Sequence, residues 1–132
     1  MGEQDPHQRL REVVLSSAPP DAVAVYLYGS QARGDASPES DIDLGLLLAR
    51  RPRPTLEGPA RDLEDAVERS LRRTTQVVVL NTAPADLVHR VLRDGILLLD
   101  RDRASRIRFE VQSRNEYFDL EPIRRLYRRV ST

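Results

Sequence analysis

The stretch Y-G-S-Q-A-R-G-D-A-S-P-E-S-D-I-D-L, Tyr28–Leu44, decides how this chain is expected to fold. The apolar run Ala22–Tyr28 predicts a strand that ends at the Gly29-Ser30 turn. A short helix after this turn exposes its first backbone N–H groups, which can bind phosphate oxygens. The stretch therefore predicts a strand, a phosphate-binding turn and then a second strand.

Two aspartates two residues apart, Asp41 and Asp43, open the second strand, which is predicted over Asp41–Leu48. Because side chains alternate between the faces of a strand, both aspartates share one face. The other face receives four apolar residues: Ile42, Leu44, Leu46 and Leu48. Mg²⁺ prefers one or two protein carboxylates together with substrate phosphates and water. We expect a site for a nucleoside triphosphate and metal on one face and the core on the other.

A Gly-Ser pair alone is commonly just a turn, and D-x-D alone is commonly a solvated loop. Their order between two apolar strands is what indicates a site. In this interpretation Gly29 and Ser30 bind the terminal phosphates, Arg33 adds positive charge there, and Asp41 and Asp43 are the catalytic metal ligands. The expected cofactor is Mg²⁺, bound together with a nucleoside triphosphate as substrate.

Composition narrows the function classes. The 132 residues carry 21 basic side chains, all of them Arg, balanced by 21 acidic ones. No overall field favours a nucleic acid or an anionic membrane, so no direct nucleic-acid binding is expected and the arginine clusters are interpreted as solvated helix faces. The absence of Cys excludes disulfides and thiolate metal sites. Without an apolar leader, or an apolar run of the ~20 residues that span a bilayer, we expect a cytoplasmic protein.

The remaining pattern predicts a single domain over residues 1–132, with a C-terminal helical segment from about residue 101. The expected fold class is α/β (mixed α+β), a small mixed sheet of about four strands with helices packed on it. Prolines mark residues 49–59 as a loop. Beyond the segments already named, helices are predicted around residues 10–14, 56–71 and 85–94, and strands over residues 74–80 and 96–99.

Side-chain patterns give finer expectations. Asn81 and Pro84 carry the cap and first-turn signals of the helix that follows them. The buried face of that helix is expected to be Leu87, Val88, Val91 and Leu92, and residues 96–99 are expected to be buried. One apolar stripe is expected on the C-terminal segment at Ile107, Val111 and Phe118, and another, after Pro122, at Ile123, Leu126, Tyr127 and Val130. His89 is interpreted as a structural or surface residue.

The blocks G-S-Q-A-R-G-D and S-D-I-D-L resemble the signature of minimal nucleotidyltransferases of the DNA polymerase β superfamily. Three later blocks are similar to those of the antitoxin group in that family: N-T-A-P at Asn81–Pro84, D-G-I-L-L at Asp94–Leu98 and N-E-Y-F-D-L-E-P at Asn115–Pro122. The resemblance implies the polymerase β-like fold, an HEPN-domain ribonuclease toxin as protein partner, and transfer of AMP from ATP to a toxin tyrosine.

One departure from the family pattern concerns the third carboxylate, which the resemblance places at the start of the next strand. There the chain reads T-T-Q-V-V-V-L, with Gln76 at the aligned position, and neither Asp nor Glu occurs between Glu68 and Asp86. Glutamine cannot act as a base or contribute negative charge. Loss of a general base commonly lowers rates ~10²–10⁴-fold.

Three functions therefore stand. The first is an antitoxin that neutralises its toxin by adenylylation. The second is a catalytically impaired antitoxin that acts by binding and occlusion alone. The third is a small-molecule nucleotidyltransferase, which the chain's size disfavours because such enzymes generally carry a further substrate-binding domain. The absence of an R-x4-H motif indicates that the chain is not itself the toxin.

Overall fold

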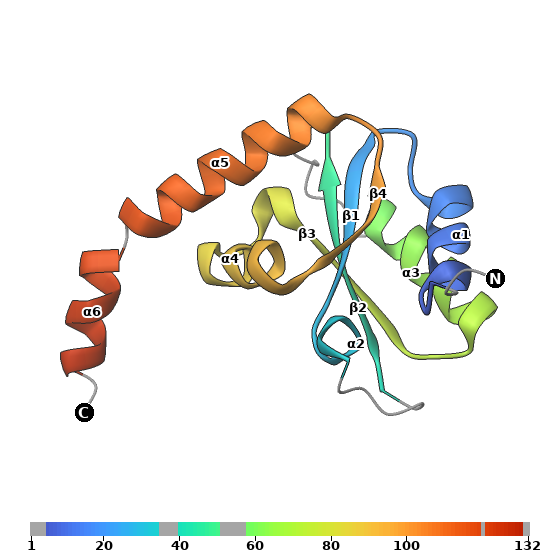
Figure 1. Ribbon diagram of the computed structural model, residues 1–132, viewed down its shortest axis with the longest axis horizontal. Helices are drawn as coiled ribbons and strands as arrows, with labels where there is room; N and C mark the ends of the chain where they lie inside the picture. Colours follow the sequence, from blue (N-terminus) through green and yellow to red (C-terminus); the bar gives the residue numbers. More distant parts are fainter. Residues whose placement is uncertain (1–4, 35–39, 51–57, 120, 131–132) are drawn as a thin grey trace.

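Four strands form one mixed sheet in the order β3-β2-β1-β4 (Figure 1). The computed structural model describes residues 5–34, 40–50, 58–119 and 121–130. The strands are β1 (Ala22–Tyr28), β2 (Ile42–Leu48), β3 (Thr75–Val79) and β4 (Ile96–Asp100). β1 is antiparallel to β2 and to β4, whereas β2 and β3 are parallel. The predicted mixed sheet of about four strands is confirmed, and β1 has the predicted bounds.

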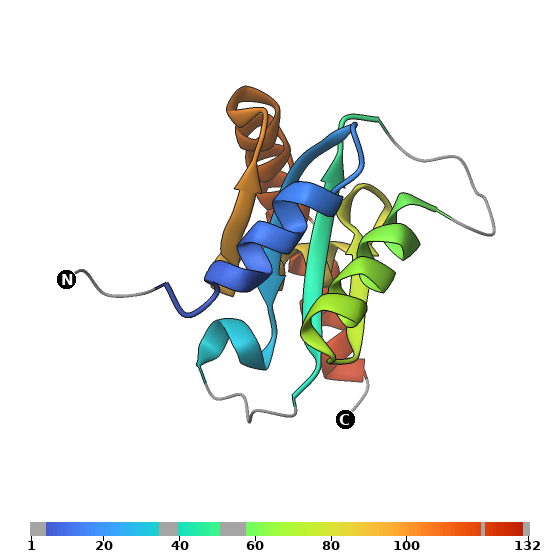
Figure 2. The same ribbon diagram turned by 90° about the vertical axis from the view of Figure 1, so that its right-hand side faces the viewer.

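Helices cover both faces of this sheet (Figure 2). α1 and α3 pack on one face and α4 and α5 lie against the other, while α6 lies at the end of α5 that is far from the sheet (Figure 1). The helices are α1 (Gln8–Ser17), α2 (Ser30–Arg33), α3 (Pro59–Leu71), the 3-10 helix η1 (Leu80–Thr82), α4 (Ala85–Asp94), α5 (Arg103–Asp119) and α6 (Glu121–Val130). No described helix is long and apolar enough to cross a membrane.

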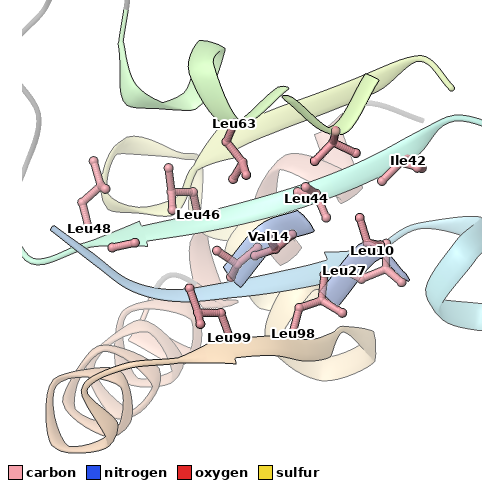
Figure 3. Packing of buried hydrophobic residues seen from close by; sticks show 13 residues of the cluster. Leu10, Val14, Leu27, Ile42, Leu44, Leu46, Leu48, Leu63, Leu98 and Leu99 are labelled. Atoms are coloured by element: carbon pink, nitrogen blue, oxygen red, sulfur yellow. The ribbon is translucent and has the colours of Figure 1, made fainter. Parts of the chain in front are cut away.

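Strand β2 separates two apolar clusters. Its even-numbered side chains, Ile42 to Leu48, join the cluster beneath α1 and α3 (Figure 3). Leu47, on the opposite face, belongs to the second cluster with Tyr26 of β1 and Val91 of α4. The predicted alternation along β2 is therefore confirmed for its apolar residues, and it leaves Asp43 on the face that α4 covers in part.

The outer edge of β3 is closed by acidic side chains of α3. The backbone N–H of Thr75 donates to Glu68 Oε1 at 3.0 Å, and the N–H of Val77 donates to Glu64 Oε2 at 3.0 Å. An exposed strand edge carries unpaired N–H groups that can pair with another chain. Both carboxylates of α3 that lie nearest β3 are thus engaged in holding this edge.

The expected cap at Asn81 is wrong. Its side-chain oxygen accepts the N–H of Leu48 at 2.9 Å and its amide nitrogen donates to the carbonyl of Leu48 at 2.9 Å. The N-cap of α4 is instead Pro84, without a side-chain cap bond. The pattern around Asn81 predicted the position of the helix, but the side chain extends the pairing of β2 past the end of β3.

The stripe expected on α5 does not face the sheet. Ile107, Val111 and Phe118 are exposed, whereas Phe109 packs against the second cluster. Polar groups fix the helix: Arg106 pairs with Asp100 of β4 at 3.1 Å and with Glu110 at 2.9 Å, and the Tyr26 hydroxyl donates to Glu110 at 2.8 Å. Burial and the Glu110 carboxylate raise the pKa of Tyr26, which keeps its hydroxyl protonated. α5 is therefore anchored to the sheet by these hydrogen bonds and ion pairs, and not by the expected apolar stripe.

Two burial predictions hold in part. Val88 and Val91 are buried in α4 while Leu87 and Leu92 are half-buried, and in β4 only Leu98 and Leu99 are buried. Residues 96 and 97 are only half-buried because β4 is an edge strand of the sheet. Residues 51–57 of the predicted loop, Leu56 of the expected helical stripe, and the side chain of Val130 lie outside the described residues.

Arg72, which caps the C-terminus of α3, is the one described non-glycine residue with positive φ, at 54°. We expect Arg72→Gly to raise the free energy of unfolding by about 1 kcal/mol, because an L side chain in the left-handed region is strained and glycine is not. Chemical denaturation measures this change. Arg72→Ala removes the guanidinium but keeps the strain, so an equal gain in Arg72→Ala would contradict the backbone explanation.

Candidate functional site

The turn that ends β1 brings Gly29 against the carboxylate of Asp43. Gly29 has φ of +74°, and a Cβ built on it would lie 2.6 Å from Asp43 Oδ2. Only glycine meets both demands, because an L side chain is strained at this φ and its methyl group would occupy the position of the carboxylate oxygen. The two halves of the sequence motif, separated by residues 30–42, are in contact.

Asp43 occupies the middle of a row that crosses three strands. It is the Cα partner of Tyr28 on β1 and of Gln76 on β3. Residues paired across a sheet present their side chains to the same face. Tyr28, Asp43 and Gln76 are therefore neighbours on one face, and Gln76 takes the position beside Asp43 at which the resemblance expects a carboxylate.

The two aspartates repel each other. Asp43 is half-buried, and burial together with the negative charge of Asp41 raises the pKa of its carboxyl. Burial, then the Asp43 charge, also raises the pKa of the neighbouring Tyr28 hydroxyl, while Arg90 of α4 opposes this shift. A bound cation would offset the repulsion between Asp41 and Asp43.

The donor set fits Mg²⁺ that is bound together with a substrate. Among the described residues, no group of three or more His, Cys, Asp or Glu side chains could enclose a metal ion. Two carboxylates suit Mg²⁺ when phosphate oxygens and water supply the remaining ligands. Asp41 and Asp43 could hold the metal only as part of a complex with a phosphate ligand.

The other predicted residues lie around α2. Ser30 opens this helix directly after Gly29, where the first N–H groups of a helix lack partners within it. The Gln31 side chain donates to the carbonyl of Ser40 at 3.3 Å, which links α2 to the start of β2. Arg33 ends the helix and is exposed. The hydrogen bond from Arg93 lowers the pKa of Asp94 on α4, and the charge of Arg33 adds to this shift. Ser30 adjoins the Gly29–Asp43 contact, whereas Arg33 lies at the far end of α2.

Two features of this face were missed by the sequence reasoning. One is Arg90 of α4, whose positive charge acts on the Tyr28 hydroxyl and opposes the rise of its pKa. His89 of α4 stacks on Tyr117 of α5, with ring centroids 3.7 Å apart and an interplanar angle of 5°, and Phe118 meets both rings edge-on. The interpretation of His89 as structural agrees with this stacking. The block containing Tyr117 and Phe118 was noted in the sequence, but its contact with α4 depends on tertiary packing.

The comparisons with known proteins agree with this fold. The family model described as polymerase beta, nucleotidyltransferase, matches residues 12–104. No curated protein matches the sequence. Among solved structures, a chain of a toxin-antitoxin crystal structure with AMP-PNP is 22% identical with a TM-score of 0.77, and the match covers 97% of this chain and 100% of that one.

A second solved structure holds the tri-AMPylated HEPN toxin of Shewanella oneidensis in complex with its MNT antitoxin. The matched chain is 21% identical with a TM-score of 0.70, and the match covers 96% of each chain. At this level of identity the likeness establishes a shared fold. The polymerase β-like fold expected from the sequence is confirmed.

The contact between Gly29 and Asp43 gives a matched pair of variants. Gly29→Ala and Gly34→Ala both place a side chain at positive φ, and each should lower the free energy of unfolding by about 1 kcal/mol. Only at Gly29 does the new methyl group displace Asp43, since a Cβ at Gly34 meets nothing within 4 Å. Calorimetric titration with ATP and Mg²⁺ should show binding lost in Gly29→Ala alone. Equal affinity in the two variants would contradict the contact's role.

Proposed function

The chain belongs to the polymerase beta nucleotidyltransferase family, and on this premise we propose that it is a cytoplasmic antitoxin that transfers AMP from ATP to a tyrosine of an HEPN ribonuclease toxin. The observation that carries the proposal is the Asp43 carboxylate, which lies against the Gly29 turn and beside Tyr28 and Gln76. Support for the partner comes from the toxin-antitoxin complexes that share the fold along nearly the full chain.

The proposed roles follow from where the residues lie. Gly29 shapes the turn so that the first N–H groups of α2 and the Ser30 hydroxyl can bind the β and γ phosphates. Arg33 adds positive charge at the other end of α2. Asp41 and Asp43 would hold Mg²⁺, which neutralises charge on the phosphates and favours in-line transfer. The half-buried position of Asp43 strengthens these electrostatic contacts relative to open water.

In the transfer, the phenolic oxygen of the acceptor tyrosine attacks the α phosphorus of ATP. The bond from that phosphorus to the oxygen bridging the β phosphate breaks, and pyrophosphate leaves with the electron pair. The phenolic proton passes to water, because Gln76 cannot accept it. The chain's own contribution is therefore to bind and orient ATP beside the partner, without a general base on β3.

A second candidate function, occlusion of the toxin without chemistry, is favoured by Gln76 beside Asp43. The nearest carboxylates of α3 do not replace the missing one, since Glu64 and Glu68 hold the N–H groups of Val77 and Thr75 at the outer edge of β3. Either function requires a surface that binds the partner.

The C-terminal helices offer such a surface. Six of the large exposed apolar side chains in the described residues lie on α5 and α6: Ile107, Val111, Phe118, Ile123, Leu126 and Tyr127. These two helices form a C-terminal arm: α5 begins against the sheet, and Figure 1 shows that the arm then extends away from the sheet to α6. Exposed apolar side chains gathered on one segment are typical of protein interfaces. We propose that the arm binds the toxin.

The transfer predicts a distinct order of rates for four proteins. When each is incubated with the toxin, ATP and Mg²⁺, mass spectrometry of the toxin should show slow addition of AMP by the wild type and none by Asp43→Asn. Gln76→Asp should be faster by about 10²-fold, because it restores a base beside Asp43. Asp65→Asn, an exposed change of equal charge on α3, should behave as the wild type.

Transfer that persists in Asp43→Asn would show that the site lies elsewhere. If the wild type adds no AMP although the complex forms, the transfer is refuted and occlusion alone stands; a gain in Gln76→Asp alone would show that the missing carboxylate is the cause.

The partner surface predicts a contrast between two leucines of nearly equal exposure. Leu126 on α6 is 61% exposed and Leu15 on α1 is 60% exposed. Leu126→Glu should weaken the complex with the toxin by about tenfold or more, because a charge would be buried in the interface, while Leu15→Glu should leave it unchanged. Surface plasmon resonance measures both affinities. Equal affinities would place the interface on another face.

A further inference from the structure

A cleft of about 840 Å³ opens behind α2, between the start of α1 and the end of α3. Its floor is apolar and includes Leu10, Ala32 and Leu71. Sites for small molecules have volumes of about 300–1,000 Å³ and combine apolar walls with a few polar groups. The cleft therefore has the size and the lining of a small-molecule site.

Arginines gather on this cleft. Arg9, Arg72 and Arg73 line it together with Arg33, and none of its described lining residues is acidic. The Arg9 guanidinium donates to the carbonyl of Ser70 at 3.0 Å. Within the described part of the chain, the guanidinium groups of Arg72 and Arg73 have no hydrogen bond or ion pair. Arg11, Arg93 and Arg106, by contrast, are each paired with a carboxylate.

The cleft is distinct from the carboxylate site. Of the residues that begin β2, Ile42 lines the cleft, whereas Asp43 faces the opposite side of the strand. Neither Gly29 nor Ser30 is among the described lining residues. The two sites adjoin at the start of β2 and at α2, whose first residues adjoin Asp43 and whose last residues, Ala32 and Arg33, line the cleft.

We propose that this cleft is a second ligand site that binds a small phosphorylated nucleoside, with the phosphate on Arg72 and Arg73 and the ring system on the apolar floor. Guanidinium groups form charge-assisted hydrogen bonds with phosphate, often in bidentate geometry. The volume suits a free mononucleotide. The ring of a nucleoside can pack on the apolar floor, whereas inorganic phosphate has no apolar part to place there. An occupant of the cleft would contact α2 from behind and so influence the phosphate-binding turn.

The backbone at Arg72 supplies an independent argument. Its positive φ is a conformation that glycine adopts without strain, yet the chain carries an arginine whose side chain lines the cleft. Arg72→Gly should therefore change two measured quantities in opposite directions. It should raise the free energy of unfolding, because the backbone strain is removed, and it should weaken ligand binding, because the guanidinium is lost.

The test is calorimetric titration of the full chain with AMP in the presence of EDTA, which removes metal from the carboxylate site. The wild type should bind AMP. Arg72→Gly and Arg73→Gln should each weaken binding by about tenfold, which is the loss of one charge-assisted contact. Asp43→Asn should bind AMP as the wild type does, because its carboxylate lies on the other face of β2.

A matched control removes two arginines elsewhere. Arg50 and Arg61 are exposed and line neither this cleft nor the turn, so the double variant Arg50→Gln/Arg61→Gln should retain wild-type affinity. If this control loses as much AMP affinity as the cleft variants, AMP binding depends only on the net charge of the protein, and the assignment of the site to the cleft is overturned. Loss of binding in Asp43→Asn, or no binding to the wild type, would overturn it as well.

Two further probes test the choice of ligand. Inorganic phosphate should bind more weakly than AMP by about tenfold or more, since it cannot use the apolar floor. Equal affinity for phosphate would overturn the nucleoside assignment. A single-stranded RNA that binds more tightly than AMP, and loses its affinity in Arg73→Gln, would replace the small ligand with a nucleic acid.

Discussion

The alternation of side chains along β2 is the constraint on which the rest of the structure depends. Because successive residues point to opposite faces, the strand that fills the core beneath α1 and α3 also presents Asp43 to the other side. A slip of one residue would turn the carboxylate into the core beneath α1 and α3 and remove the leucines from it. Core packing therefore fixes the position of Asp43 against Gly29, and the free energy that holds the fold together also holds the candidate site in place.

Carboxylates are divided between two tasks in this part of the molecule. Glu64 and Glu68 of α3 close the outer edge of β3, which keeps the edge from pairing with other chains. Asp41 and Asp43 are the carboxylates left for the proposed metal site, and burial together with the negative charge of Asp41 raises the pKa of Asp43. With Gln76 in the third position, the proposed site carries less negative charge than three carboxylates would give. It would repel the ATP phosphates less, but it would also attract Mg²⁺ less and would lack a base.

Local patterns predicted much of the fold. The apolar run Ala22–Tyr28 and the alternation after Asp41 depend on neighbouring residues alone. The first strand has the predicted bounds, and the second begins at Ile42, one residue later than predicted, so that Asp41 directly precedes it. Contacts between distant segments could not be predicted in this way. Asn81 pairs with the backbone of Leu48 rather than capping α4, and α5 is anchored by Arg106 rather than by its apolar stripe. The arginine cleft joins α1, α2 and α3, so no single stretch of sequence shows it.

The most direct test of the account is to locate bound metal and nucleotide on the chain by NMR. Mn²⁺ can replace Mg²⁺ on oxygen ligands and broadens the signals of nearby amides. With ATP and substoichiometric Mn²⁺, the account predicts selective broadening at Gly29, Asp43 and Gln76, while amides of Val14 and Leu63 beneath the opposite face stay sharp. Broadening centred on the cleft of Arg72 and Arg73, or a pattern unchanged by Asp43→Asn, would contradict the assignment of the metal and nucleotide site to this face of β2.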